Sequence, residues 1–430
     1  MLDRKQAPET YEIDAVTLQI AQVQHLRNGA RLHIIHNETQ PVIRLDFVFK
    51  AGKWFEPKPG VSDLAVKMLL EGSKNYTAKQ IADKVAFYGA SFENNHGYDR
   101  TELTLYCLSK YLKELLPLVC DVVQNPTFPE AEFNLLKQRT SQNVKVQRQK
   151  NNYLATHAFT KQIYGDNHPY VFGYEENAFE GMSLDTLKQF YQEHFNTANL
   201  DVFVCGDVGE LLETELVAAL EQLDLKNPSE EQKPLAVIST KPQHEELVEI
   251  PESLQSSIRM GKRFPLHQDE DYLRLKVLNE ILGGYFGSRL MRNIREDKGY
   301  TYGIHSVISP KEHDSLFYIG TDVNYAVTEN TIEEIKKEIV KLQQEEVPEE
   351  ELHTVKNYML GKFVNDFITI FDQSDKYKNI VLHKLHQDYY NTYLTTIRTV
   401  TAPELQALAQ QYLQLDSLHT AIAGRKKEKE

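Results

Sequence analysis

The histidine pairs are the first residues whose type and spacing suggest chemistry, because imidazole is a common metal ligand and general base. His33 and His36 lie in Arg-Leu-His-Ile-Ile-His, a segment with the composition of a strand. Side chains three positions apart on a strand point to opposite faces, so these two cannot share a metal ion. His383 and His386 lie near an expected helix end with Asp388 close by. This spacing is a weak metal signal, and a solvated helix face is the better interpretation.

A glycine-rich run, Leu-Gly-Gly-Tyr-Phe-Gly from Leu282 to Gly287, is the next candidate, because such runs can cradle a phosphate group. A phosphate loop of the Walker type continues with Gly-Lys and a Ser or Thr, and these residues do not follow here. The run is therefore not expected to bind a nucleotide.

The cysteines argue for a reducing compartment. Cys107, Cys120 and Cys205 are odd in number and contain no Cys-x-x-Cys pair, so a disulfide framework is not expected. The N-terminal segment, Met-Leu-Asp-Arg-Lys-Gln-Ala-Pro-Glu-Thr, lacks the apolar core of a signal peptide. We therefore expect a cytoplasmic bacterial protein, unless a leader has been removed.

Composition and charge narrow the function classes. The chain has 430 residues, 41% of them hydrophobic, which is enough for more than one core. Lys and Arg number 48 against 62 Asp and Glu, so the formal net charge is -14. An acidic surface repels nucleic acid and anionic lipid, and neither is expected as a partner. No apolar run reaches the length of about 18 residues that a membrane-spanning helix requires.

Two segments of the chain repeat each other. Ser183 to Gly206 and Thr401 to Gly424 align without a gap, and each reads as a capped amphipathic helix, a short loop and an apolar strand. A second correspondence joins Gln40-Pro-Val-Ile-Arg-Leu to Gln255-Ser-Ser-Ile-Arg-Met. The repeat predicts two similar domains.

We expect these domains to span residues 1–228 and 243–430, joined by a linker at 229–242 that is rich in Pro, Ser and charge. The segments 43–50 and 101–108 alternate apolar and polar residues, as half-covered strands do. The pattern therefore predicts that each half is an α+β domain, with an antiparallel-rich sheet covered by helices.

The segment from Gly60 to Phe92, with Met-Leu-Leu-Glu-Gly in its middle, resembles the pitrilysin/insulinase family of inverted-zincin metallopeptidases, in its processing-peptidase-like branch. Active members carry His-x-x-Glu-His on the helix at this place, which binds zinc and activates water. Asp63, Val66 and Lys67 stand at the three motif positions here. A lysine ammonium repels a dication, and a valine cannot take a proton from water.

The family's third zinc ligand is a Glu on a later helix, and the resemblance places its counterpart near Val144. No Asp or Glu occurs between Phe133 and Tyr164, a segment that is basic and rich in amides. The resemblance therefore predicts a degenerate zinc site and no metal in this chain.

The second half resembles the family's C-terminal domain over Gly283 to Ile304. That domain carries an Arg and, seven positions later, a Tyr that reach the active site, which here are Arg295 and Tyr302. A guanidinium and a phenol can hold a peptide and stabilise the oxyanion of its hydrolysis. We expect a short helix around Ile294, ended by Gly299, with Tyr302 at the start of a strand.

The resemblance implies a zinc-free partner subunit of a heterodimeric metallopeptidase, inactive alone, because paired chains of this family close like a clam shell. Zinc is expected in a homologous subunit with an intact motif, although a homodimer is also open. Unfolded peptides would be the substrates, captured by strand addition at Phe92–Asn95. The main alternative is a structural or binding protein with this fold, like respiratory-complex core subunits. A free-standing enzyme with another residue set has no visible constellation to support it.

Overall fold

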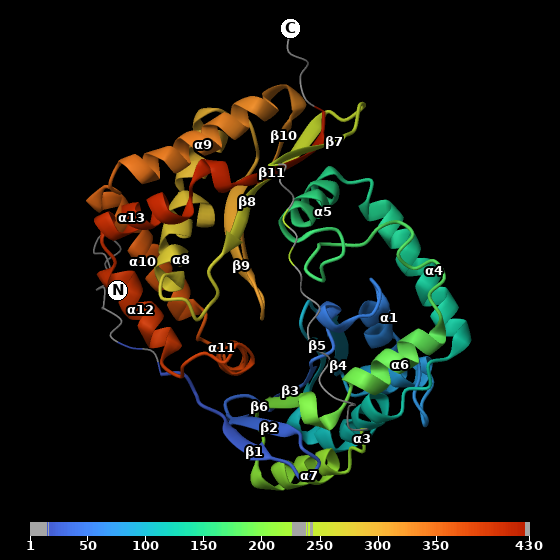
Figure 1. Ribbon diagram of the computed structural model, residues 1–430. Helices are drawn as coiled ribbons and strands as arrows, with labels where there is room; N and C mark the ends of the chain where they lie inside the picture. Colours follow the sequence, from blue (N-terminus) through green and yellow to red (C-terminus); the bar gives the residue numbers. More distant parts are fainter. Residues whose placement is uncertain (1–14, 16, 226–237, 239, 241–243, 426–430) are drawn as a thin grey trace, which may run out of the picture.

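The computed structural model describes residues 15, 17–225, 238, 240 and 244–425, which form two lobes arranged as an open ring (Figure 1). Each lobe is built on one sheet, as the α+β prediction requires. The expected linker at 229–242 lies almost wholly outside the described residues.

The first sheet has the strand order β1-β2-β6-β3-β5-β4, antiparallel except for the β2–β6 pair. Its strands are β1 Gln22–His25, β2 Arg31–His36, β3 Val42–Phe49, β4 Ser91–His96, β5 Thr101–Leu108 and β6 Leu200–Gly206. The helices of this part are α1 Val61–Met68, α2 Ala78–Phe87, α3 Leu112–Gln124, α4 Glu130–Gln147, α5 Asn151–Tyr164, α6 Leu184–His194 and α7 Glu210–Glu221.

The second sheet has the order β7-β11-β8-β10-β9, antiparallel except for β7–β11. Its strands are β7 Glu245–Glu249, β8 Gln255–Phe264, β9 Ile304–Pro310, β10 Ser315–Asn324 and β11 His419–Gly424. Its helices are α8 Tyr272–Asn279, α9 Thr328–Gln344, α10 Glu349–Asn365, α11 Ile370–Leu382, α12 Tyr389–Thr399 and α13 Ala402–Tyr412, with π-helical segments at Glu280–Gly284 and Met291–Asp297.

The sequence repeat corresponds to equivalent places in the two sheets. Strand β6 lies between β2 and β3, and β11 lies between β7 and β8. The preceding helices, α6 and α13, begin after the two predicted N-caps: the Ser183 hydroxyl accepts a hydrogen bond from the backbone of Thr186, and Thr401 forms a capping box with Glu404. The repeat therefore marks the same helix-to-strand unit in each half.

Each half lends a helix to the other half's sheet. Helix α5 packs on β8 and β11, where Phe159 and Ile163 join a core cluster with Leu316 and Ala421 (Figure 1). Helix α11 packs against β6, and its Tyr377 joins a cluster on the first sheet. The two halves therefore share apolar cores.

Strand β3 differs from the sequence expectation because of this exchange. The alternating pattern of residues 43–50 suggested one solvent-facing side, yet β3 is buried along nearly its whole length. Helix α11 covers the second face, where Asp375 pairs with Arg44 at 2.7 Å and Lys378 pairs with Asp46 at 2.7 Å. The polar residues of the pattern thus form ion pairs between the halves, whereas β5 keeps the expected alternation.

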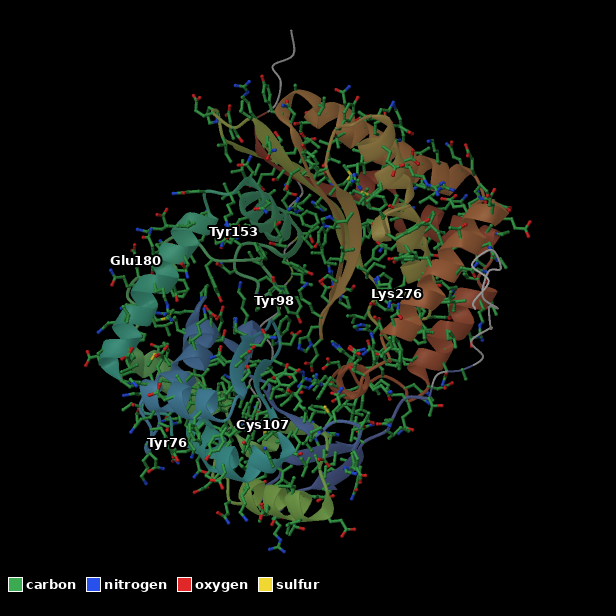
Figure 2. The ribbon with its side chains drawn as sticks, turned by 180° about the vertical axis from the view of Figure 1, so that it is seen from behind. Tyr76, Tyr98, Cys107, Tyr153, Glu180 and Lys276 are labelled. Carbon is green, nitrogen blue, oxygen red and sulfur yellow. The ribbon has the colours of Figure 1, made fainter. Side chains whose placement is uncertain are left out.

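The turn between β9 and β10 forms a second joint. The backbone N–H of Glu312 donates to Asp99 at 3.0 Å, and the Glu312 carboxylate pairs with Arg100 at 2.9 Å. The His313 ring stacks on Trp54, with their centroids 4.2 Å apart. Tyr98, next to Asp99, lies near the middle of the ring of elements in Figure 2. This joint and the exchanged helices fix the relative position of the two sheets.

The described residues contain no helix of the length and apolar character needed to cross a membrane.

Candidate functional site

Helix α1 carries Asp63, Val66 and Lys67, the predicted positions of the degenerate zinc motif, here called the α1 window. The two charged side chains of this window pair with each other. The Lys67 ammonium donates to the Asp63 carboxylate at 2.9 Å, an ion pair four residues apart on one helix face. The family resemblance predicts that these two positions correspond to the histidines of the motif. Val66, at the position of the catalytic Glu, has no exposed surface and packs in the main core. The window therefore presents an internal ion pair and a core residue.

A chain of polar groups leads away from this window. The Ser62 hydroxyl lies 2.7 Å from Glu56 Oε2 and 2.7 Å from His96 Nε2. The other ring nitrogen of His96 lies 3.8 Å from Asp63. Burial raises the pKa of the Glu56 carboxyl to about 7, against the opposing charge of Lys53, and burial lowers the pKa of His96 to about 4.

This Ser–His–Asp arrangement is absent from the sequence interpretation, because His96 lies on β4, 34 positions from Ser62. It does not form a nucleophilic triad. Ser62 is 0% exposed and also contacts Glu56, so a substrate carbonyl cannot reach its hydroxyl. Glu56 also accepts the backbone N–H of Gly60 at 3.0 Å. The chain of polar groups therefore orders the start of α1.

The expected third-ligand position lies on α4. Val144 is buried in the main core, so it offers no ligand and little room for one. The basic residues nearby pair with a neighbouring loop: Arg148 lies 3.0 Å from Glu175, and Lys145 lies 3.9 Å from Glu176. Within residues 15, 17–225, 238, 240 and 244–425, no group of three or more His, Cys, Asp or Glu side chains is placed to hold a metal ion. The residues at the predicted zinc-motif positions thus do not fit zinc.

The histidine pairs singled out in the sequence have structural roles. His33 is buried between Asp201 and Tyr377, at 3.1 and 3.0 Å, whereas His36 faces solvent. The two therefore lie on opposite faces, as the strand assignment predicts. His383 caps α11, and the His386 ring accepts a hydrogen bond from the backbone of Asp388.

The segment from Arg295 to Tyr302 in the second half is more exposed to solvent than the α1 window. Arg295 lies in the π-helical segment Met291–Asp297, which ends before Gly299 at φ 63°, the left-handed turn that the sequence predicted. Tyr302 is 98% exposed, and strand β9 begins two residues later than expected, at Ile304. Arg295 packs its guanidinium on the Phe286 ring, with Cζ 4.5 Å from the ring centroid. In the described residues, no carboxylate lies within ion-pair distance of Arg295.

Two residues near Arg295 and Tyr302 are held by contacts within the chain. Arg289 forms a two-pronged ion pair with Glu351 at 3.0 and 2.8 Å. Tyr300 is half-buried and packs against the core of the second half. The structure thus places the half-buried Arg295 and the exposed Tyr302 on one segment, in which Arg289 and Tyr300 are held by contacts within the chain and Arg292 is exposed.

The peptide-capture segment Phe92–Asn95 lies within β4, the last strand of the first sheet. Strand β9 holds the corresponding edge of the second sheet. Next to the Tyr302 turn, a polar hollow of about 550 Å³ is lined by residues 149–152, 253–255, Ser257 and Asp322. The carbonyl of Asp322 accepts a hydrogen bond from the Thr301 hydroxyl at 2.8 Å, so the hollow adjoins that turn.

Two family models match the chain, "Insulinase (Peptidase family M16)" over residues 31–169 and "Peptidase M16 inactive domain" over residues 181–359. A relative described as "Non-peptidase homolog YmxG" from Helicobacter pylori is 24% identical over 412 residues, covering 93% of each chain. An "Uncharacterized zinc protease YmxG" from Bacillus subtilis is 24% identical over 352 residues, covering 79% of this chain and 82% of the relative.

Solved structures agree in fold. The "peptidase M16 inactive domain" from Pseudomonas fluorescens superimposes with a TM-score of 0.85 at 24% identity, covering 95% of this chain and 99% of that one. A chain of complex III2 from Candida albicans gives a TM-score of 0.76 at 13% identity, covering 94% and 96%. The matched models together span both halves, and the chain belongs to the insulinase family of peptidases, M16.

Proposed function

We propose that this chain is the zinc-free partner subunit of a two-chain M16 peptidase, and that it grips the peptide and supports the transition state. The observation that carries this proposal is the exposed Tyr302 beside Arg295, a half-buried guanidinium that forms no ion pair with a carboxylate in the part of the chain that the structure describes. A phenol at the surface and a guanidinium without an ion pair among the described residues are available to a second molecule.

The chemistry of the pair suits peptide hydrolysis. When a zinc-activated water in the partner attacks a peptide carbonyl, negative charge develops on that oxygen. Arg295 would bind the substrate backbone through its N–H groups, and the Tyr302 hydroxyl would donate to the oxyanion. Both groups lie on one segment, so they would act together in a site completed by the partner chain.

The peptide itself would lie along a sheet edge. Strand β4 offers unpaired backbone groups along Phe92–Asn95, which suit an extended peptide added as a further strand. The polar hollow next to the Tyr302 turn gives room for substrate side chains on the other lobe. Only unfolded peptides could thread between two closed subunits.

The alternative is a structural or peptide-binding protein of the same fold. The similarity in fold to a chain of complex III2 supports it, because that chain belongs to a respiratory complex. The exposed phenol of Tyr302 and the guanidinium of Arg295, which pairs with no carboxylate among the described residues, favour the peptidase partner, since a purely structural role gives no reason for this arrangement.

The test is reconstitution with an M16 chain that carries His-x-x-Glu-His, encoded beside this one or in the same genome, and a quenched fluorogenic peptide. We expect hydrolysis only by the mixture. Loss of one oxyanion donor typically lowers turnover by about 10²–10³-fold, so Tyr302→Phe should approach this loss while the subunits still associate. Arg295→Ala should weaken peptide binding as well as turnover.

Two variants serve as matched controls. Arg292→Ala removes an exposed guanidinium from the same helical segment, and Tyr300→Phe removes a phenol hydroxyl two residues from Tyr302. Arg289 is a poor control because its ion pair with Glu351 supports folding. Equal turnover of the Tyr302→Phe and native complexes would contradict the oxyanion role. If no candidate partner produces hydrolysis, the structural alternative becomes the better account.

A further inference from the structure

The loop before the Arg295 helix is held in a defined shape. Gly283 lies against β9, where a Cβ atom would come within 2.7 Å of the Ser306 backbone nitrogen, so only glycine fits without a shift. Four residues of the loop close as a turn, with the Ser288 N–H donating to the Tyr285 carbonyl at 3.1 Å. The loop is therefore fixed against the same strand that follows Tyr302.

This loop presents its two aromatic side chains in different ways. The Tyr285 ring packs against Tyr358, with centroids 4.8 Å apart, and contacts the core of the second half. Phe286 is 64% exposed. A single exposed phenylalanine is common on protein surfaces. This one has a specific contact, because the Arg295 guanidinium lies over its ring at 4.5 Å.

The contact between the guanidinium and the ring suits a substrate-binding arginine. A guanidinium packed on an aromatic ring uses its flat face, and the N–H donors around its edge remain free for a carbonyl or carboxylate. An ion pair would orient the group equally well but would occupy those donors. Arg289, which lies six positions before Arg295, illustrates that second arrangement, because it forms an ion pair with Glu351.

We propose that Phe286 is the positioning residue for Arg295: its ring holds the guanidinium over the loop with the N–H edge directed to peptide substrate. The open part of the same ring then offers an apolar surface next to the bound backbone, which favours peptides with a large apolar side chain there. This inference rests on the proposed function, because it assigns a role to the substrate-binding Arg295.

The test uses the full chain in the reconstituted complex with its zinc-bearing partner. A cation–π contact at an exposed site contributes about 0.5–1 kcal/mol, so Phe286→Ala should raise KM about 2–5-fold with a smaller change in kcat. Phe286→Trp keeps an aromatic face and should restore KM. Phe286→Leu keeps apolar bulk without that face and should behave like alanine toward peptides that lack a large apolar side chain.

A double-mutant cycle separates positioning from a structural role. In the Arg295→Ala background, Phe286→Ala should cause no further rise in KM for those same peptides, because the group it positions is gone. Thermal unfolding of each variant should match the native chain, since Phe286 is largely exposed.

The outcomes distinguish this inference from the proposed function. If Arg295→Ala impairs the complex and Phe286→Ala does not, the positioning role is wrong and the proposed function stands. If Phe286→Ala raises KM by the same factor in the native and the Arg295→Ala backgrounds, the ring acts independently of the guanidinium and the inference fails. If Arg295→Ala leaves hydrolysis unchanged, the proposed function itself fails, and the inference falls with it.

Discussion

The α1 window and the Arg295–Tyr302 segment are the two regions to which the family resemblance assigns chemistry, and they differ in how their polar groups are satisfied. In the window, Asp63 and Lys67 neutralise each other at 2.9 Å over a fully buried Val66. In the segment, Tyr302 is 98% exposed and Arg295 rests on a phenylalanine ring. One region is complete within the chain, whereas the other has donors available to a second molecule.

This difference indicates what each region does for folding. The window's side chains pair with each other, contact the Glu56–Ser62–His96 chain of hydrogen bonds and fill the core under α1, so they contribute to stability. The exposed phenol of Tyr302 adds little to stability, since it buries almost no surface. The exposure of Tyr302 is what the proposed role in a second chain's active site requires.

The largest expected effect comes from rebuilding the zinc motif as Asp63→His, Val66→Glu and Lys67→His. Val66 is fully buried in the core, and an unpaired carboxylate there should lower the free energy of unfolding by about 3–5 kcal/mol. Zinc binding should remain weak, because Val144 supplies no third ligand. Denaturant unfolding and metal titration measure the two effects.

The single variant Val66→Leu is the control for packing changes at the same position, and it should cost far less than the glutamate. The native chain, dialysed against trace zinc, should retain none in stoichiometric amount. A rebuilt motif that binds zinc tightly with unchanged stability would show that our placement of the window is wrong.

The second effect is a pH dependence of stability in the first region. The pKa of Glu56 is raised to about 7, so its contribution to stability is present at low pH and lost as pH rises from about 4.5 through 7. The pKa of His96 is lowered to about 4, so its contribution is present above 6.5 and lost as pH falls through 4. The two slopes oppose each other.

Removing one group should therefore expose the slope of the other. Relative to the native chain, Glu56→Gln should gain stability as pH rises from about 4.5 to 7, because the opposing Glu56 term is gone. His96→Asn should lose stability relative to the native chain over about pH 4 to 6.5. Urea unfolding at several pH values gives these difference curves, and parallel curves for all three proteins would contradict the pKa assignments.

Sequence reasoning predicted the elements that repeat or carry local signals. The N-caps Ser183 and Thr401, the glycine turn at Gly299 and the edge position of Phe92–Asn95 follow from short-range patterns, and the structure confirms them. The family resemblance assigned the degenerate motif to Asp63, Val66 and Lys67, because the spacing of the motif is fixed on one helix, and this assignment stays a prediction.

Contacts between distant segments could not be predicted in this way. The burial of β3 on both faces depends on α11, more than 300 residues away, whose Asp375 pairs with Arg44. The approach of His96 to Ser62 and the stacking of Arg295 on Phe286 depend on how a strand and a loop are placed in three dimensions. A single sequence carries no signal for such pairings, since each partner looks ordinary in its local context.

The smallest expected effects are on stability, and they separate the two regions most directly. Asp63→Asn keeps the shape of the side chain and removes the charge that Lys67 pairs with. The lysine side chain is 39% exposed and the aspartate 11%, so the pair should be worth about 0.5–1 kcal/mol of unfolding free energy. Tyr302→Phe should change that free energy by less than about 0.5 kcal/mol, because the hydroxyl has no partner to lose.

In the reconstituted complex the order should reverse: Asp63→Asn should leave peptide hydrolysis unchanged, and Tyr302→Phe should lower it. Equilibrium unfolding and turnover measured on the same two preparations check both halves of this reversal. Loss of hydrolysis in Asp63→Asn would mean that the α1 window also serves the shared active site, and the contrast between a closed and an open region would no longer hold.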